Sequence, residues 1–256
     1  MNKKLITLLI IFAAIITFWL SAKMLISRFS GEVVTYYKDN VEVAKIKYYK
    51  NGEQKMTGTI PDGLVKGFQK IGKFSFEENY KNGKKDGLCK VLFENGKVYF
   101  SRNYKDGKLN GLTTMYYAGN GKPEVETNYK DDIGNGISRR YYPTGVLESE
   151  DNYKNGKLVG LSRSYYKTGK LETEINFKDG KVNGSWKGYY ETGSLKEECS
   201  YVDDEQTGIS KEYHKNGKLK EEGPYKNGLK NGMQKYYNEK GELVKAEIII
   251  EKQTKK

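Results

Sequence analysis

A repeat of 24 residues constrains this chain more than any other feature of its sequence. The unit Tyr153–Asn176 reads YKNGKLVGLSRSYYKTGKLETEIN, and Tyr129–Asn152 and Phe177–Ser200 repeat its frame on either side. Further units open at Tyr80, Tyr104, Tyr201 and Tyr225, with one extra residue in the turn Ala118–Gly121. A fixed period of this length is typical of a repeat array, in which each unit packs mainly on its neighbours. The repeat therefore predicts an architecture before it predicts a function.

Two turn signals divide each unit, whose positions we number from the opening aromatic residue. Positions 2–4 are usually Lys-Asn-Gly or Lys-Asp-Gly, as in Lys81-Asn82-Gly83, and a second turn recurs at positions 16–17, as in Thr168-Gly169. Asn-Gly and Asp-Gly tolerate the positive φ that two-residue hairpin turns require. Tyr, Leu, Val and Ile are frequent between the turns, as in strands. Each unit is therefore predicted to be a β-hairpin with strands of about eight to ten residues.

Glycine recurs at position 8 of every clear unit. In a strand interior it predicts a bulge or a close contact with a neighbouring aromatic ring. A phosphate-binding glycine loop would instead lead into a helix, and none is predicted. The glycines are Gly87, Gly111, Gly136, Gly160, Gly184, Gly208 and Gly232.

Charged residues fit the hairpin register. If the second turn centres between positions 16 and 17, position 11 lies opposite position 22, and opposite charges placed so contribute about 0.2–1 kcal/mol each. The same register places Tyr166 opposite Leu171, and a bulge at the turn would shift these partners by one residue. The predicted ion pairs are Arg139–Glu150, Arg163–Glu174, Lys187–Glu198 and Lys211–Glu222.

The first thirty residues differ from the repeats. Leu5–Ala22 contains only apolar residues besides Thr7, Thr17 and Ser21. As a helix this stretch rises about 27 Å, close to the thickness of a bilayer core. We expect residues 1–30 to be an uncleaved transmembrane anchor. The alternative is a cleaved signal peptide, although the cleavage site after Ser21-Ala22 is weak. Either way the repeats are expected outside the cytoplasm, membrane-anchored or, after cleavage, secreted.

The remaining chain divides in two. Residues 31–79 are predicted to be degenerate capping repeats, because terminal repeats are commonly atypical. Residues 80–256 hold the regular repeats, the closing edge strand Leu243–Ile250 and a charged tail. Only 36% of residues are apolar, and 22 are tyrosines, which can bury a ring while the hydroxyl stays wet. The predicted fold is all-β: a linear array of antiparallel hairpins that forms an elongated sheet or a rolled solenoid, after one transmembrane helix.

The charge pattern bounds the partners. The chain carries a net charge of +12, but basic and acidic residues interleave along the strands. Weak attraction to anionic envelope polymers or lipid headgroups is compatible with this pattern. No nucleic-acid recognition motif is present, and an exported chain is not expected to bind nucleic acid. Cys89 and Cys199 lie four periods apart, about 40 Å in an extended array, too far for a disulfide.

Residues able to carry out chemistry do not form a recognisable set. His214 occupies position 14, where other units hold tyrosine, so it is interpreted as a substituted tyrosine and not as a general base. Asp131-Asp132 and Asp203-Asp204-Glu205 replace the usual Asn-Gly turn without forming an Asp-rich calcium loop. We therefore predict no catalytic residue, no metal, no cofactor and no enzymatic activity.

Aromatic residues are the candidates for partner binding, since tyrosine and tryptophan are enriched in binding hot spots. Trp186 is the most specific candidate, because position 10 holds Ser, Thr, Cys or Gln in the other clear units. The alternative for each tyrosine is packing between neighbouring hairpins. The candidate set is Trp186, Tyr189, Tyr190, Tyr165, Tyr166, Tyr141 and Tyr142.

The repeat frame resembles the bacterial variant of the MORN repeat. Gly160–Gly180 shows the likeness best, with a Tyr-Tyr pair followed by Gly169, Leu171 and Glu174. The likeness covers Tyr80 to about Leu243 strongly. Proteins with this variant are often labelled antitoxin-like, and eukaryotic relatives are linked with membrane attachment and scaffolding. We expect a non-enzymatic membrane-anchored scaffold for protein contacts at the bacterial envelope. The alternatives are an antitoxin-like immunity protein that neutralises a toxin, and a binder of anionic envelope polymers or lipid headgroups.

Overall fold

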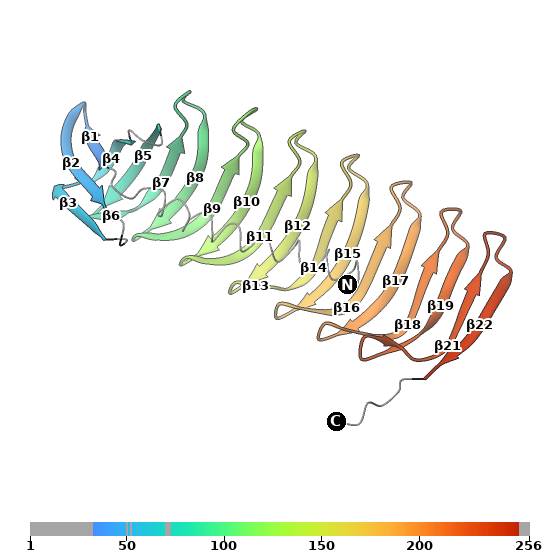
Figure 1. Ribbon diagram of the computed structural model, residues 1–256. Helices are drawn as coiled ribbons and strands as arrows, with labels where there is room; N and C mark the ends of the chain where they lie inside the picture. The colour runs from blue at the N-terminus through green and yellow to red at the C-terminus, as the bar shows by residue number, and fades with distance from the viewer. Residues whose placement is uncertain (1–32, 50, 52, 70–72, 251–256) are drawn as a thin grey trace. The chain divides into compact units, whose positions relative to one another are not determined.

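The computed structural model describes residues 33–49, 51, 53–69 and 73–250, and every regular element in them is a β-strand (Figure 1). The chain divides into two compact units, one ending at Val98 and the other beginning at Tyr99. The predicted all-β fold of antiparallel hairpins is confirmed for these residues. No helix that could cross a bilayer occurs in them. The predicted transmembrane segment Leu5–Ala22 lies outside the described residues.

The first unit does not follow simple hairpin order. Strand β1 pairs with both β2 and β4, while β3 pairs with β2, so the order is β3-β2-β1-β4-β5, with β6 and β7 against β5. The chain after β3 therefore returns past β2 to reach the other side of β1. The strands are β1 (Val33–Lys38), β2 (Val41–Tyr48), β3 (Gln54–Gly58), β4 (Gly63–Gln69), β5 (Phe74–Lys81), β6 (Lys84–Lys85) and β7 (Gly87–Leu92).

A small core holds the first unit together. Its buried residues are Val34, Tyr36, Ala44 and Val65, one or two from each of β1, β2 and β4. The buried carboxylate of Glu78 beside them accepts a hydrogen bond from the Tyr80 hydroxyl at 2.8 Å and pairs with the Lys85 ammonium at 2.5 Å. These partners satisfy the carboxylate, which would otherwise be costly to bury.

The second unit is an open antiparallel sheet in which strands follow one another in chain order (Figure 1). The short strands β13 and β20 continue the hairpins of β12 and β19. The strands are β8 (Val98–Lys105), β9 (Lys108–Tyr116), β10 (Pro123–Lys130), β11 (Ile133–Tyr141), β12 (Leu147–Lys154), β13 (Lys157–Leu158), β14 (Gly160–Tyr165), β15 (Leu171–Lys178), β16 (Lys181–Tyr189), β17 (Leu195–Val202), β18 (Glu205–Tyr213), β19 (Leu219–Lys226), β20 (Leu229–Lys230), β21 (Gly232–Tyr237) and β22 (Leu243–Ile249).

The first turn of each repeat has the predicted two-residue geometry. Asn155 and Gly156 have φ of 50° and 76°, the left-handed pair that a tight hairpin turn requires. Asp203 and Asp204 adopt the same conformation, with φ of 48° and 75°. The Asp-Asp sequences therefore make the same turn as Asn-Gly.

The second turn is one residue longer than predicted. The amide of Tyr166 donates to the carbonyl of Lys170 at 2.8 Å, and the amide of Gly169 donates to the carbonyl of Tyr166 at 2.8 Å. Such three-residue loops carry a left-handed glycine and a bulge. The register shifts between Ser164 and Tyr165, so Tyr165 lies opposite Leu171. The predicted placement of Tyr166 opposite Leu171 was therefore wrong.

The register that places position 11 opposite position 22 is confirmed. The predicted ion pairs form at Arg139–Glu150 and Arg163–Glu174, whereas, among the described residues, the lysines at position 11 of the next two repeats lie opposite their glutamates without an ion pair. Arg163 lies opposite Glu174, and the equivalent pairs of the neighbouring repeats are also in register. The other three pairs are Arg139–Glu150, Lys187–Glu198 and Lys211–Glu222.

The recurring glycine at position 8 has a backbone reason, as predicted. All seven glycines have φ between 70° and 112°, where residues with a Cβ are strained. At Gly184 an added Cβ would lie 3.2 Å from the Cβ of Asn176, the last residue of the preceding repeat. The nearest neighbour is an asparagine at four of the seven glycines and a proline at Gly232, and nothing in the described part of the chain lies within 4 Å at Gly160 and Gly208, so no aromatic ring explains the glycine.

Candidate functional site

Hydroxyl groups link each repeat to the next in the second unit. The tyrosine at position 14 donates to the main-chain carbonyl of position 13 in the following repeat. His214 takes the same place with its Nε2 atom, as expected of a substituted tyrosine. The pairs are Tyr117–Tyr141 at 2.6 Å, Tyr142–Tyr165 at 2.8 Å, Tyr166–Tyr189 and Tyr190–Tyr213 at 2.7 Å, and His214–Tyr237 at 2.9 Å.

A second set of hydroxyls reaches the preceding repeat. The tyrosine at position 13 donates to the glutamate at position 22 of the repeat before it, and the acceptor is a carboxylate. The pairs are Tyr141–Glu126 at 2.8 Å, Tyr189–Glu174 at 3.1 Å, Tyr213–Glu198 at 2.8 Å and Tyr237–Glu222 at 2.9 Å. Tyr116 and Tyr165 are the exceptions in this series: no hydrogen bond of either hydroxyl is found within the described part of the chain.

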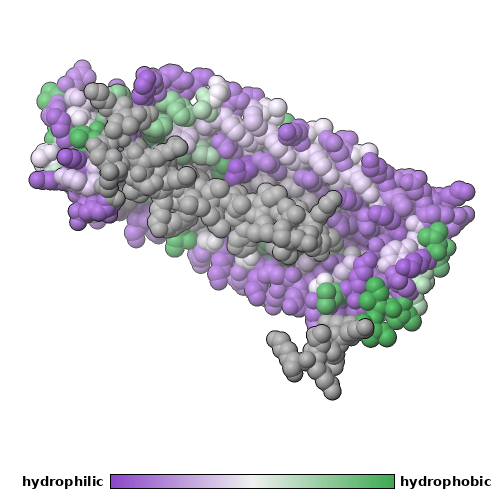
Figure 2. Space-filling model, viewed as in Figure 1, coloured by the Kyte–Doolittle hydropathy of each residue, from purple (hydrophilic) through white to green (hydrophobic). Residues whose placement is uncertain are grey.

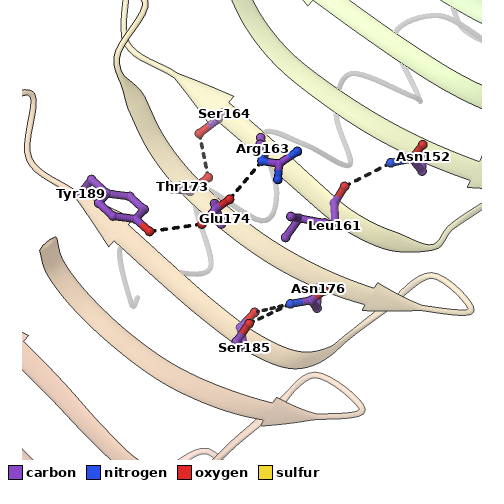
Figure 3. Close-up of polar contacts among 9 residues, drawn as sticks. All are labelled: Asn152, Leu161, Arg163, Ser164, Thr173, Glu174, Asn176, Ser185 and Tyr189. Atoms are coloured by element: carbon purple, nitrogen blue, oxygen red, sulfur yellow. Dashed lines mark hydrogen bonds and ion pairs between the residues drawn. The ribbon is translucent and has the colours of Figure 1, made fainter. Parts of the chain in front are cut away.

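The centre of this network is Glu174, whose two oxygens serve different partners (Figure 3). Arg163 Nε donates to Oε1 at 3.0 Å, and the Tyr189 hydroxyl donates to Oε2 at 3.1 Å. Arg139 and Glu150 repeat the ion pair one hairpin earlier, at 2.8 Å. The arginine side chains remain 38–40% exposed, so water and salt weaken the attraction. This face of the sheet, which carries positions 11 and 22, is called the ion-pair face below.

Burial and the carboxylates keep these tyrosines protonated. Burial, then the hydrogen bond to Glu126, raises the pKa of Tyr141 to about 12. The same causes, with Glu198 as acceptor, raise the pKa of Tyr213 to about 12. The pKa of Tyr189 is also raised, by burial first and by Glu174 next. Near neutral pH these phenols are therefore protonated and act as hydrogen-bond donors.

Trp186 lies on the opposite face of the sheet from this network. It pairs with Ile175 and Cys199, both buried, whereas Lys187 next to it pairs with Glu174 and Glu198. Successive side chains of a strand point to opposite faces. A single flat partner surface therefore cannot contact both Trp186 and the Tyr189–Glu174 pair.

A glycine makes room for the Trp186 ring. A Cβ added to Gly188 would lie 2.6 Å from the ring atom Cη2 of Trp186 and 3.1 Å from Cζ3. The equivalent position of the previous repeat is Ser164, in a hairpin whose position 10 is the small Ser162. The sheet therefore has room for the large ring at Trp186, where the other clear units hold a smaller residue at position 10.

The six candidate tyrosines form one row along neighbouring hairpins. Each is half-buried, and five of the six hydroxyls bond to an adjacent repeat. These bonds correspond to the packing role that the sequence left open for them. The half-exposed surface of the same residues still leaves the row accessible. The row comprises Tyr141, Tyr142, Tyr165, Tyr166, Tyr189 and Tyr190.

Sequence reasoning overlooked an asparagine that recurs at position 24. Asn152 Nδ2 donates to the carbonyl of Leu161 at 3.2 Å, across the bulge that the position-8 glycine creates (Figure 3). The same bond joins Asn79 to Leu88 at 2.6 Å, Asn103 to Leu112 at 2.8 Å and Asn128 to Ile137 at 3.0 Å. The signal was present in the sequence, because an asparagine lies eight residues before five of the seven glycines, the exceptions being Gly208 and Gly232.

The aspartates of the altered turns have a structural use. Asp204 Oδ1 accepts a hydrogen bond from the amide of Val182 at 2.7 Å, and Asp132 Oδ1 accepts one from Leu109 at 2.7 Å. Each links its turn to the preceding repeat. Among the described residues no group of three or more His, Cys, Asp or Glu side chains could hold a metal ion. Cys89 and Cys199 are both buried and do not form a disulfide.

Comparison with known families agrees with the repeat geometry. Five segments match the family described as the MORN repeat variant, and no curated protein sequence matches the chain. The matched segments are residues 85–106, 135–155, 158–179, 182–203 and 206–227.

Proposed function

We propose that this chain, a MORN repeat variant protein by the five repeats within residues 85–227, is a non-enzymatic scaffold that binds a partner protein along its repeats. The observation that supports this function is the row of half-exposed tyrosines at equivalent positions of successive hairpins, bordered by Arg–Glu pairs. Equivalent residues recur every two strands, about 10 Å apart. Such a row suits an extended partner better than a small ligand.

The ion-pair face is the binding surface in this proposal. Tyrosine offers a large contact area at low entropic cost, and arginine is likewise enriched at interface hot spots. Arg139 and Arg163 are each about two-fifths exposed and can add a bond to a partner without leaving their glutamates. Tyr165 is the best residue to mutate in a binding test. Its hydroxyl makes no hydrogen bond within the described residues, so a substitution there removes no such bond from the fold.

The location in the proposal comes from the N-terminal sequence. The apolar stretch Leu5–Ala22 would anchor the chain in a bacterial membrane and leave the repeats outside the cytoplasm. Mass spectrometry of the mature protein tests the anchor. An intact N-terminus supports it, and a new N-terminus between Ala22 and Gly31 would establish a cleaved signal peptide instead.

Crosslinking in intact cells, followed by purification of the tagged chain, tests the scaffold. We expect a specific protein to be captured by the wild type and by Tyr165→Phe, and to be lost with Tyr165→Ala. Trp186→Ala is the control on the opposite face and should retain capture. If Trp186→Ala loses the partner while Tyr165→Ala keeps it, the binding face is wrong. If the wild type captures no protein, the scaffold function is wrong.

A further inference from the structure

The last strand of the second unit, β22, has a free edge that carries apolar side chains. Among the described strands it pairs in register with β21 alone. Three of its apolar side chains are strongly exposed, Leu243 at 56%, Val244 at 62% and Ile248 at 65%. Ile250, which follows the strand, is 77% exposed. Figure 2 shows an apolar patch at this end of the sheet, next to surface that is largely hydrophilic in this view. An unprotected edge of this kind is a template for pairing with another strand.

The sequence of β22 is self-complementary about Ala246. In an antiparallel pair of two copies centred there, Lys245 lies opposite Glu247 of the second copy, and Glu247 lies opposite its Lys245. Val244 of each copy then lies opposite Ile248 of the other, and Leu243 of each copy lies opposite Ile249 of the other. Opposite charges and apolar pairs directly across a ladder are both stabilising. The strand therefore complements itself on both faces.

The charges select this register over its neighbours. Centring the pair on Lys245 would place two ammonium groups opposite each other, and centring it on Glu247 would do the same for two carboxylates. A parallel arrangement in register would also bring like charges together. Like charges opposite each other destabilise a ladder. Only the antiparallel register about Ala246 satisfies all four charges.

The side chains are already placed for this contact. Lys245 and Glu247 form an ion pair on one face of β22 at 2.8 Å, and they remain 58% and 37% exposed. A second copy would add a carboxylate to each lysine and a lysine to each carboxylate. Val244, Ala246 and Ile248 lie on the other face, where two copies would join into one apolar strip.

The other free edge lacks these properties. Strand β3 is exposed along its whole length and pairs, among the described strands, with β2 alone. Its sequence Gln54–Gly58 holds one lysine and no acid, and Met56 is its only large apolar residue. Pairing of β22 with β3 would leave Lys245 without a carboxylate opposite it, because β3 holds no acid.

From these observations we infer that the chain forms a two-fold symmetric dimer through antiparallel pairing of β22 with β22 of a second copy. The contact is isologous, so it closes after two copies and does not propagate into fibres. It joins the sheets of two second units at their C-terminal edges. A single-strand contact buries little area, so we expect reversible association at about micromolar concentrations.

Charge reversal tests the register. Full-length protein in a mild non-ionic detergent is examined by sedimentation velocity over a concentration series. We expect the wild type to dimerise, and Lys245→Glu or Glu247→Lys alone to weaken dimerisation at least tenfold. The double variant Lys245→Glu/Glu247→Lys should dimerise again, because each position still meets the opposite charge. A monomeric wild type, or single variants that dimerise like it, would overturn the inference.

Cysteine crosslinking tests the geometry. Paired residues of an antiparallel ladder have Cα atoms about 4.5–5.5 Å apart, within reach of a disulfide. Ala246→Cys should therefore crosslink to itself under mild oxidation. Val244→Cys alone should not, because its counterpart lies about 14 Å away along the ladder, but it should crosslink when mixed with Ile248→Cys. The wild type, whose two cysteines are buried, is the control. Val244→Cys crosslinking to itself as fast as Ala246→Cys would exclude the proposed register.

Discussion

The hydroxyl of Tyr166 donates a hydrogen bond to the main-chain carbonyl of Tyr189, 23 residues further along the chain, at 2.7 Å. Neighbouring repeats make the equivalent bond, and His214 makes it with an imidazole nitrogen. The array is therefore held together by the backbone ladder and by a side-chain ladder that connects hairpins.

Removing one hydroxyl from this ladder should loosen the contact between two repeats. We expect Tyr166→Phe to lower the free energy of unfolding by about 1 kcal/mol, because the carbonyl of Tyr189 loses its side-chain donor. Tyr165→Phe is the matched control, since its hydroxyl makes no hydrogen bond within the described residues, and it should change stability by less than about 0.5 kcal/mol. Urea unfolding of both variants measures the difference. Equal effects would show that the hydroxyl bond contributes nothing specific.

The ion pair of Arg163 with Glu174 should be weak and sensitive to salt. A double-mutant cycle with Arg163→Ala and Glu174→Ala is expected to give a coupling energy of about 0.2–1 kcal/mol, because the arginine is 38% exposed. Raising the ionic strength to 1 M should reduce the coupling further. A coupling that is large and independent of salt would contradict this account.

Gly188 should be coupled to the ring of Trp186. Gly188→Ala places a Cβ 2.6 Å from the ring, so we expect it to cost about 1–3 kcal/mol. In a Trp186→Ser background the same change should be neutral or stabilising, because glycine weakens a strand interior. Thermal unfolding of the two single variants and the double variant measures the coupling. A similar cost in both backgrounds would show that the ring does not occupy that space.

Asp204 combines a left-handed backbone with a hydrogen bond to the amide of Val182. Asp204→Ala should destabilise by about 2 kcal/mol, since it loses the bond and strains the backbone. Asp204→Asn keeps an oxygen acceptor and tolerates positive φ, so it should cost less than about 1 kcal/mol. If alanine and asparagine cost the same, the side-chain bond is not the reason for the aspartate.

Asp151 should make stability depend on pH. Burial raises the pKa of its carboxyl group, against the opposing effects of the Ser162 hydroxyl and the Arg140 charge. The folded state therefore binds this proton more tightly than the unfolded state, and stability falls as pH rises from the unfolded pKa of about 3.9 through the higher pKa of the folded state. Asp151→Asn should raise the melting temperature at pH 7, and the gain should vanish below about pH 4.

The control for this pH dependence is Asp179→Asn, which removes the same charge from an exposed turn. It should alter the melting temperature equally little at both pH values. A melting temperature of Asp151→Asn below that of the wild type at pH 7 would show that hydrogen bonds to the carboxylate outweigh its burial.

The repeat period and turn residues predicted the hairpins, the left-handed turns and the ion pairs of Arg163 and Arg139. They did not predict which residue absorbs the bulge at the second turn. That bulge inserts one residue and moves Tyr165, not Tyr166, opposite Leu171. A pattern with a period of two cannot locate such an insertion, because either side of it shows the same alternation.

The candidate site was harder to predict than the fold. Trp186 and Tyr189 are close in sequence, yet their contacts lie on opposite faces of the sheet, and only the pairing of Lys187 with Glu174 reveals this. In the first unit no regular repeat sets a register, so the return of β4 to β1 depends on tertiary packing of Val34, Tyr36 and Val65. Local turn chemistry carries no information on such a contact.

The acceptor for the hydroxyl at position 14, as in the bond from Tyr166 to Tyr189, is a main-chain carbonyl, which every amino acid supplies. A hairpin that arrives beside a new neighbour therefore finds its bonding partner without any matching substitution there. We expect the chain to tolerate the loss or gain of a whole 24-residue repeat, as unequal crossing-over in its gene would produce. The shortened or lengthened chain should still fold. A chain with Tyr153–Asn176 deleted checks this: it should still unfold cooperatively, with a strand content reduced by one hairpin. The length of the array can then change by whole repeats to suit a partner before individual side chains are substituted.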